Sequence, residues 1–563
     1  MPPFRVSIAQ INTSVGDLKA NESKIIRCIK KARTLKSDVI VFPELTVTGY
    51  PPEDLLHKPH FVNGNLASVN KIAEATINLC AVYGFVENQN GLYNSAAIAH
   101  NGKLISTYQK KLLPNYGVFD EKRYFENGND TKIYHLAGVN IGINICEDIW
   151  FSSGPIKEQS NCGAELIINI NASPYHINKQ LERTKMLSQR ARDNAVSIVY
   201  VNMVGGQDEL VFDGGSMILD PKGTIVHGGY QFTEQLVTCD LNIASKNQVD
   251  IPQVERVFIT DQTTDKKKPE IDIVPPIAPM EEIEEIYNAL VLGTRDYVRK
   301  CGFTKVLIAL SGGIDSSLVA AIAVKALGRE NVVGLSMPSM FSSDGSKLDA
   351  KELAENLGIM FKTIEINQIF EIFANSLSDE FAGTDWDATE ENIQSRIRGN
   401  LVMAMSNKFN WLVLTTGNKS EMAVGYATIY GDMAGGFSVI KDIPKTTVYD
   451  LCEHINRSEP VPVIPYNVID KPPSAELRPD QKDSDSLPDY STLDSILRLY
   501  IEDDMSMDNI VNRGFEKSTV SEVIKLVDRN EYKRRQSAPG VKITSKNFGR
   551  DRRMPISNKF KSY

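Results

Sequence analysis

The chain reads Lys305-Val306-Leu307-Ile308-Ala309-Leu310-Ser311-Gly312-Gly313-Ile314-Asp315-Ser316-Ser317, and this stretch decides the fold of its second half. The apolar run predicts a buried strand, and the Ala-rich segment 318–327, which Gly328 closes, predicts a helix. A glycine-rich turn between a strand and a helix binds phosphate, because glycines let the backbone approach an anion and free N–H groups favour negative charge. We therefore expect an anion site at this turn.

The turn does not end in the Gly-Lys-Ser/Thr of a Walker loop. Its Ser-Gly-Gly-x-Asp-Ser pattern, residues 311–316, resembles the pyrophosphate loop of enzymes that split ATP into AMP and pyrophosphate. The resemblance implies adenylation chemistry. The alternative is a glycine-rich turn that arose by chance between a strand and a helix.

Composition restricts the class of protein. The chain has 563 residues, 42% of them hydrophobic, and a net charge of −9, which fits a globular protein of several domains and argues against a nucleic-acid partner. Its seven cysteines include no Cys-x-x-Cys pair, so we expect reduced thiols and a cytoplasmic location. We expect no signal peptide, because the chain runs straight into a strand-like segment at 4–10. We expect no membrane contact, because no apolar run approaches the ~20 residues of a membrane helix.

Strand-like and helix-like segments alternate through both halves, on either side of a polar, Pro-rich connector. We predict a first domain at 1–245, a linker at 246–278 and a second domain at 279–563. The predicted strands of the first domain are Val39–Phe42, Ala81–Val86, Val139–Ile145, Leu166–Ile170, Ile198–Asn202 and Ser216–Leu219. Those of the second are Val306–Leu310, Val332–Met337, Phe361–Ile366 and Trp411–Thr415.

The second domain begins with a predicted helix at 281–290, whose first turn is acidic, and then follows the rhythm of an open parallel α/β sheet. Such a sheet binds ligands at the carboxyl ends of its strands. Residues 467–490 are rich in Pro, Asp and Ser, and we expect a mobile loop there.

A second polar turn, Thr416-Gly-Asn-Lys-Ser-Glu421, follows the predicted strand at 411–415. If this strand neighbours the first, Asp315 and Glu421 would lie close enough to share Mg²⁺, a cation that takes carboxylate and phosphate oxygens. Lys445 would neutralise phosphate charge. The plain alternatives are a solvated helix start for Glu421 and a solvent-exposed lysine for Lys445.

These turns, with Tyr430-Gly-Asp432 and Ser474-Ala-Glu-Leu-Arg-Pro479, resemble the NAD synthetase family over roughly 280–550. That family adenylates the nicotinate carboxylate of deamido-NAD and displaces AMP with ammonia. The resemblance implies that deamido-NAD contacts Asn392, Glu421 and Lys533 and that Asp315 and Glu421 hold Mg²⁺. It also implies an ATP site made of Ala309, Leu310, Ser311, Gly312, Gly313, Ile314, Asp315, Ser316 and Thr416, to which we add Lys445.

One position departs from the family pattern. Smaller, ammonia-using relatives have Thr-Lys-Tyr-Gly-Asp where this chain has Thr428-Ile429-Tyr430-Gly431-Asp432. The ligand-contacting lysine is therefore absent at Ile429. We expect Lys533, in the basic cluster 533–535, to supply the charge instead.

Three residues of the first half, each at the end of a strand or beside a turn, form a candidate nucleophilic site. Glu44 follows the strand at 39–42, Lys110 lies in Tyr108-Gln-Lys-Lys-Leu112, and Cys146 ends the run 142–146. A thiol attacks as the thiolate, so it needs a base or a stabilising charge. Glu44 would move the proton, and Lys110 would support the oxyanion and keep a nearby thiolate charged. Taken singly, each residue has a plain structural alternative.

The order of these residues resembles the Glu-Lys-Cys triad of the nitrilase family, and the resemblance spans roughly 4–240. It implies an αββα sandwich. It also implies that Glu121 is the second glutamate of the family and that Tyr116, Ser173 and Lys179 hold glutamine, with Lys179 suited to its carboxylate.

Together the two resemblances imply the family of glutamine-dependent NAD synthetases, with deamido-NAD, ATP and L-glutamine as substrates. Related enzymes form dimers or octamers, so we expect a homo-oligomer. One alternative is another ATP-pyrophosphatase amidotransferase, making GMP or asparagine, although those use different glutaminase folds. Another is a nucleotide sensor with a degenerate amidase half.

Overall fold

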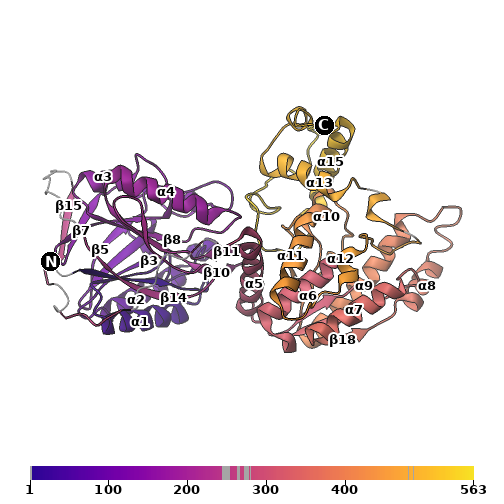
Figure 1. Ribbon diagram of the computed structural model, residues 1–563, viewed down its shortest axis with the longest axis horizontal. Helices are drawn as coiled ribbons and strands as arrows, with labels where there is room; N and C mark the ends of the chain where they lie inside the picture. Colours follow the sequence, from indigo (N-terminus) through magenta and orange to yellow (C-terminus); the bar gives the residue numbers. More distant parts are fainter. Residues whose placement is uncertain are drawn as a thin grey trace. The chain divides into compact units, whose positions relative to one another are not determined.

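The structure is a computed structural model that describes residues 3–243, 254–262, 267–271, 278, 280–479, 481–485 and 487–563. The chain forms two compact units (Figure 1). The first consists of Met1–Gln207 and Val211–Met280, and the second of Asp208–Leu210 and Glu281–Tyr563.

Two mixed sheets form the centre of the first unit, one with six strands in the order β14-β1-β2-β3-β4-β5 and one with seven in the order β13-β12-β9-β8-β7-β6-β15. The strands of the first are β1 (Phe4–Gln10), β2 (Val39–Val41), β3 (Cys80–Asn88), β4 (Leu92–His100), β5 (Lys103–Gln109) and β14 (Gln235–Leu241). Those of the second are β6 (Lys132–Leu136), β7 (Val139–Ile145), β8 (Leu166–Asn171), β9 (Ser197–Asn202), β12 (Met217–Leu219), β13 (Ile225–Gly228) and β15 (Glu255–Thr260). A separate pair is β10 (Val204–Gln207) and β11 (Leu210–Asp213).

Helices cover the outer face of each sheet (Figure 1). The helices of this unit are α1 (Leu18–Thr34), α2 (Pro59–Glu74), α3 (Pro155–Asn161) and α4 (Lys179–Asn194), with short 3₁₀ helices η1 (Glu53–His57), η2 (Glu121–Arg123) and η3 (Cys146–Ile149).

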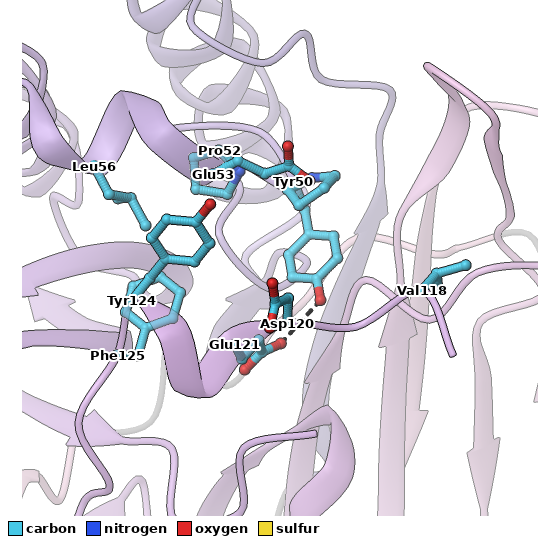
Figure 2. Close-up of a pocket in the computed structure, with 10 residues that line it drawn as sticks. Tyr50, Pro52, Glu53, Leu56, Val118, Asp120, Glu121, Tyr124 and Phe125 are labelled. Atoms are coloured by element: carbon cyan, nitrogen blue, oxygen red, sulfur yellow. Dashed lines mark hydrogen bonds between the residues drawn. The ribbon is translucent and has the colours of Figure 1, made fainter. Parts of the chain in front are cut away.

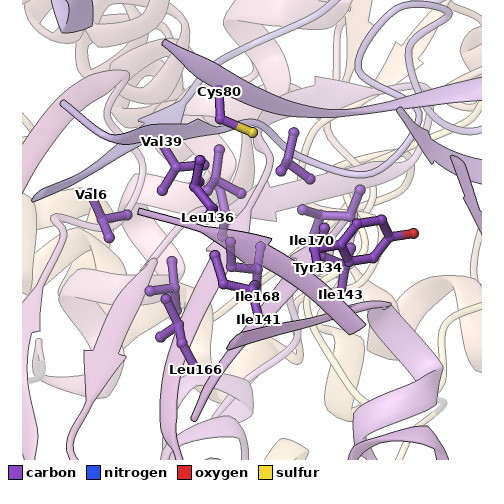
Figure 3. Packing of buried hydrophobic residues seen from close by; sticks show 14 of the residues in the cluster. Val6, Val39, Cys80, Tyr134, Leu136, Ile141, Ile143, Leu166, Ile168 and Ile170 are labelled. Carbon is purple, nitrogen blue, oxygen red and sulfur yellow. The ribbon is translucent and has the colours of Figure 1, made fainter. Parts of the chain in front are cut away.

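Alternating side chains on the strands produce the four layers. Val39 and Val41 pack between the two sheets, where Figure 3 shows the core, whereas Ile40 packs outward with Ile25 of α1. Helix α4 packs on the second sheet through residues that include Leu187. Because both faces of these strands are buried, their sequences are continuous apolar runs. This αββα sandwich confirms the predicted fold of the first unit.

Part of the predicted linker is regular structure. β15 lies within it and pairs in parallel with β6, because Val257 and Ile259 pack against the core between the sheets. Residues 246–253, 263–266 and 272–277 of the linker lie outside the described residues.

The second unit contains a five-stranded, wholly parallel sheet in the order β18-β17-β16-β19-β20. Its strands are β16 (Val306–Ala309), β17 (Val332–Ser336), β18 (Met360–Thr363), β19 (Leu412–Thr415) and β20 (Phe437–Ser438). β16 and β19 are neighbours. This adjacency meets the condition under which the two polar turns were predicted to meet.

The helices of the second unit begin with α5 and include a group near the C-terminus with its own apolar core. They are α5 (Glu282–Lys300), α6 (Ile314–Leu327), α7 (Asp344–Leu357), α8 (Asn367–Ser376), α9 (Ala388–Phe409), α10 (Lys419–Val424), α11 (Lys445–Ser458), α12 (Tyr466–Asp470), α13 (Tyr490–Leu497), α14 (Met507–Val511), α15 (Lys517–Arg529) and α16 (Glu531–Arg534), with short helical turns η4 (Arg329–Asn331), η5 (Asp483–Asp485) and η6 (Arg498–Glu502). No helix within the described ranges is long and apolar enough to cross a membrane.

The segment 467–490, expected to be a mobile loop, contains local order in its described part. α12 ends at Asp470, and η5 follows. Glu476 accepts hydrogen bonds from the side chains of Ser343 (2.8 Å) and Ser346 (2.7 Å) at the start of α7. Glu476 therefore binds this segment to the N-terminal end of α7.

Candidate active sites of the two units

Glu44 lies just beyond β2, on a fully buried turn. Its Oε2 accepts a 2.8 Å hydrogen bond from the backbone N–H of Ala172, and its Oε1 accepts one of 2.7 Å from Asn94. Gly84 is required beside this turn, because a Cβ there would lie 2.7 Å from the Glu44 Cα. The carboxylate is thus held from both sheets.

Lys110 follows β5 and is buried together with two glutamates. Its Nζ donates hydrogen bonds of 2.7 Å to Glu44 Oε1 and 2.9 Å to each oxygen of Glu121. Burial opposes the ammonium charge, but the Glu121 and Glu44 carboxylates outweigh it and raise the pKa of Lys110 well above its usual value. Lys110 is therefore a permanent cation.

Glu121 is the second buried carboxyl group on Lys110. It also accepts a 2.9 Å hydrogen bond from the Tyr50 hydroxyl, and Figure 2 shows this contact beside a pocket lined by the 50–56 turn and the 118–125 segment. Burial raises the pKa of Glu121 to about 7, a rise that Lys110 limits. The group is poised to hold a proton near neutral pH.

Cys146 is the first residue of η3, directly after β7, and it has a positive φ of 45°. This sparsely populated backbone conformation turns the chain sharply at the end of the strand. Burial raises the pKa of the thiol well above its usual value; the charge of Glu44 adds to this, and Lys110 opposes it. Lys110 thus favours the thiolate in the expected direction, but burial and the Glu44 charge outweigh its effect on the Cys146 pKa.

Beside the thiol, Tyr116 donates to both oxygens of Glu147 at 3.1 and 3.0 Å. Glu147 is buried and feels the positive charge of Lys179. Lys179 Nζ lies 4.3 Å from the centre of the Trp150 ring and 3.0 Å from Glu182 Oε2. Sequence reasoning missed Glu147, although its position next to the cysteine was the available signal.

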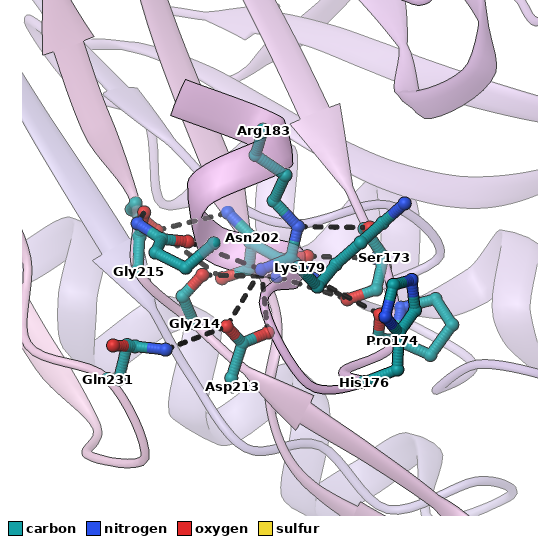
Figure 4. A network of polar contacts seen from close by, with 12 residues as sticks. Ser173, Pro174, His176, Lys179, Arg183, Asn202, Asp213, Gly214, Gly215 and Gln231 are labelled. Carbon is teal, nitrogen blue, oxygen red and sulfur yellow. Dashed lines mark hydrogen bonds and ion pairs between the residues drawn. The ribbon is translucent and has the colours of Figure 1, made fainter. Parts of the chain in front are cut away.

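Ser173 is fixed by a buried polar network (Figure 4). Arg183 donates to the Ser173 carbonyl at 2.9 Å and to its Oγ at 3.3 Å, while its Nη1 donates to both oxygens of Asp213 at 2.7 and 2.8 Å. Asn202 Oδ1 accepts the Ser173 backbone N–H at 2.9 Å. The sequence did not predict a role for Arg183, because its contacts with Ser173 form only in the folded chain.

In the second unit the predicted glycine-rich loop joins β16 to α6. Gly312 has a φ of 78°, and a Cβ there would lie 2.1 Å from the Ser346 carbonyl oxygen, so only glycine fits. The Gly313 N–H donates to Ser311 Oγ at 3.2 Å, and α6 begins at Ile314. This is the strand, turn and helix N-terminus predicted for an anion site.

Lys445 joins the two predicted metal ligands. Its Nζ forms an ion pair with Asp315 and lies 3.4 Å from Glu421 Oε1, while Asn418 donates to Asp315 at 2.9 Å. Burial and then the charge of Asp315 raise the pKa of Glu421 to about 8. Within the described residues, no group of three or more His, Cys, Asp or Glu is arranged to hold a metal. The two crowded carboxylates are nevertheless hard oxygen donors that fit Mg²⁺, which would relieve their repulsion.

The remaining residues predicted to contact ligands differ in burial and in their hydrogen-bond partners. Thr416 is half-buried after β19, and Asn392 accepts a 2.7 Å hydrogen bond from the Thr428 hydroxyl. Lys533 donates to the carbonyls of Gly425 (2.8 Å) and Ala427 (2.9 Å), and burial lowers its pKa. In this structure its charge is therefore turned toward the protein backbone next to the 428–432 turn.

Comparisons with known proteins agree with both units. Residues 5–249 match the carbon-nitrogen hydrolase family, and residues 286–537 match the NAD synthase family. The glutamine-dependent NAD(+) synthetase of Thermotoga maritima is 47% identical over 578 residues, which cover 100% of each chain. That of Aquifex aeolicus is 47% identical over 568 residues, covering 99% of this chain and 100% of its own.

A solved structure is similar over the same length. The glutamine-dependent NAD+ synthetase of Acinetobacter baumannii, in complex with ADP, is 41% identical, with a TM-score of 0.76 and coverage of 99% of this chain and 98% of its own. Since the similarity extends over both units, the chain belongs to the family of glutamine-dependent NAD(+) synthetases.

Proposed function

We propose that the enzyme makes NAD by two linked reactions whose chemistry is carried by the residues described above. In the first unit glutamine is hydrolysed to glutamate and ammonia. In the second, deamido-NAD reacts with ATP, and ammonia converts the resulting adenylate to NAD and AMP. The net reaction consumes deamido-NAD, ATP, glutamine and water and yields NAD, AMP, pyrophosphate and glutamate.

Glu44 starts the first reaction by taking the proton of the Cys146 thiol as sulfur attacks the amide carbon. The raised pKa of that thiol supports this order, because the attacking group is a neutral thiol that needs a base. Lys110 stabilises the negative charge on the amide oxygen. The C–N bond then breaks, and the leaving nitrogen takes the proton from Glu44, which gives ammonia and a thioester.

Water hydrolyses the thioester in the second half of this reaction. Glu44 takes a proton from the attacking water, the C–S bond breaks, and the Cys146 sulfur regains a proton as glutamate leaves. Glu121 stays bonded to Lys110 throughout, and its pKa of about 7 lets it exchange a proton near neutral pH.

Glutamine is a zwitterion at its α-carbon, and the polar groups beside the thiol match it. Lys179 is a partner for the carboxylate, and Glu147 is a partner for the ammonium. Tyr116, which donates to Glu147, and Ser173, which the Arg183 network fixes, would complete the glutamine site.

In the second unit a carboxylate oxygen of deamido-NAD attacks the α-phosphorus of ATP, and pyrophosphate leaves. The backbone of the 311–313 turn and Lys445 would hold the phosphates, with Thr416 at the neighbouring strand end. Asp315 and Glu421 would hold Mg²⁺, which would supply charge neutralisation on the departing pyrophosphate. Asn392, Glu421 and Lys533 are the proposed contacts of deamido-NAD.

Three coarser properties complete the proposal. The scattered free cysteines support a cytoplasmic location. The resemblance to dimeric and octameric relatives supports a homo-oligomer, which sedimentation would measure. The proposed domain limits are 1–245 and 279–563, with β15 of the intervening segment paired to the first domain, and limited proteolysis within 246–278 outside β15 would test them.

The observation that carries the proposal is the burial of Glu44, Lys110 and Cys146 at one site in a chain that also contains the glycine-rich loop. The test is to quantify NAD, AMP, pyrophosphate and glutamate after mixing the protein with Mg²⁺, ATP, deamido-NAD and glutamine. All four products should form together. Glutamate without NAD, or ADP in place of AMP, would contradict it.

A further inference from the structure

Asp148 is a buried carboxylate that joins the two sheets of the first unit at the proposed glutaminase site. It belongs to η3, two residues after the thiol. Its Oδ2 accepts hydrogen bonds from the Ile145 N–H (3.0 Å) and the Tyr108 hydroxyl (2.9 Å). Its Oδ1 accepts the backbone N–H groups of Leu112 (2.9 Å) and Lys111 (3.2 Å). One carboxylate therefore satisfies four donors from two chain segments.

These donors lie on opposite sides of the sandwich interior. Ile145 ends β7 of the seven-stranded sheet, directly before the thiol, whereas Tyr108 lies in β5 of the six-stranded sheet, two residues before Lys110. The nucleophile and the cation thus come from different sheets. A displacement of one sheet against the other would separate them, and a misplacement of ~1 Å can lower a rate about 10²-fold.

We propose that Asp148 is a positioning residue of the glutaminase reaction, which fixes the turn carrying Cys146 against the segment carrying Lys110. This inference rests on the proposed function of the first unit and assigns Asp148 no contact with glutamine. Because it acts through the geometry of the reacting groups, its loss affects the chemical step more than substrate binding.

The charge of Asp148 supports this role. Burial raises its pKa to about 6, while the backbone N–H groups of Ile145 and Leu112 lower it. The carboxylate is therefore ionised at neutral pH, and hydrogen bonds to an ionised acceptor are shorter and stronger than those between neutral groups. An amide of the same shape has one acceptor oxygen and a donor, and that donor would face either the Ile145 N–H or the N–H groups of Lys111 and Leu112.

The test compares Asp148→Asn with Glu165→Gln in the full-length protein. Glu165 is also buried and accepts a backbone N–H, that of Asn140 at 2.8 Å, but it precedes β8 and lies at the opposite end of that strand from Ser173. In Asp148→Asn, kcat for glutamine hydrolysis should fall about 10²-fold, and KM should change less than ~3-fold. Ammonia-dependent NAD synthesis should persist, and Glu165→Gln should retain both activities.

Tyr108→Phe provides a second, milder variant, since it removes only the hydroxyl that binds Asp148. It should lower kcat about 5-fold without raising KM, and it decides the question if Asp148→Asn does not fold. An unchanged kcat in the variants, or a rise in KM alone, would overturn the inference. If the unaltered protein releases no glutamate, the proposed function fails and the inference with it.

Discussion

Lys110 Nζ donates a 2.7 Å hydrogen bond to Glu44 Oε1, and both side chains are fully buried. The same ammonium binds Glu121, so one cation serves two carboxylates. Burial and then the charge of Glu44 raise the pKa of the nearby Cys146 thiol, and Lys110 opposes this rise. This arrangement supports the proposal that Glu44 takes the thiol proton as the sulfur attacks.

Glu147→Gln should raise KM for glutamine. The change keeps the shape of the side chain but removes the charge proposed to pair with the substrate ammonium. We expect a rise of roughly 10- to 100-fold with kcat changed only a few-fold. The control is Glu158→Gln, which alters a half-exposed glutamate paired with Lys111. Steady-state glutamate release measures both variants, and an unchanged KM in Glu147→Gln would remove Glu147 from the glutamine site.

Asp315→Ala should abolish NAD formation from glutamine and from ammonia alike. The carboxylate pairs with Lys445 at the glycine-rich loop and is a proposed metal ligand, and both nitrogen sources require the adenylate. We expect a loss of at least ~10³-fold, with basal glutamine hydrolysis retained. Pyrophosphate release and glutamate release are measured in parallel. Persistent ammonia-dependent synthesis would mean that Asp315 is dispensable for adenylation.

Mg²⁺ binding should release a proton from Glu421. Its pKa is raised to about 8, so at pH 7 the carboxyl group is mainly protonated and the cation must displace the proton. Affinity should therefore rise with pH up to about 8 and level off above it. Titration of Mg²⁺ into the protein–ATP complex in two buffers of different ionisation enthalpy counts the protons. Glu421→Gln should release fewer protons than the unaltered protein, and an equal count in the two proteins would contradict the assignment.

Glutamate release should accelerate when ATP and deamido-NAD are present, because hydrolysis without a waiting adenylate wastes glutamine. Coupling of this kind is typically 5- to 150-fold, so we expect roughly 10-fold. Steady-state rates with and without the two substrates give the factor. Equal rates would show that the two activities are independent.

The strands were the most predictable part of the fold. β7 has its predicted limits, because a strand buried on both faces reads as an uninterrupted apolar run. The helix after the glycine-rich loop begins at Ile314, earlier than the predicted residue 318. Its first turn contains the polar Asp315 and Ser316, which interrupt the apolar pattern that predicted the helix. β15 was not predicted, because it lies in a polar stretch. Its alternating Val257 and Ile259 contact the core between the sheets only in the folded chain.

Only those candidate site residues that lie at strand ends were predictable from the sequence. Glu44, Lys110 and Cys146 follow β2, β5 and β7, as the pattern indicated. The contacts around them are different: Asn94 of β4 reaches Glu44 from two strands away in the same sheet, and Asp148 bonds to Tyr108 of the opposite sheet. Such contacts depend on which strands face each other, and the linear sequence does not state this.

The most direct test of the account is NAD synthesis by Cys146→Ala with either nitrogen source. The thiol is needed only to release ammonia, so synthesis from glutamine should fall by at least ~10³-fold while synthesis from added ammonia continues at the rate of the unaltered protein. The measurement is NAD formed per unit time with Mg²⁺, ATP and deamido-NAD, with glutamine or ammonium as the only variable. Loss of both activities in a folded variant, or continued use of glutamine, would contradict the division of labour between the two units.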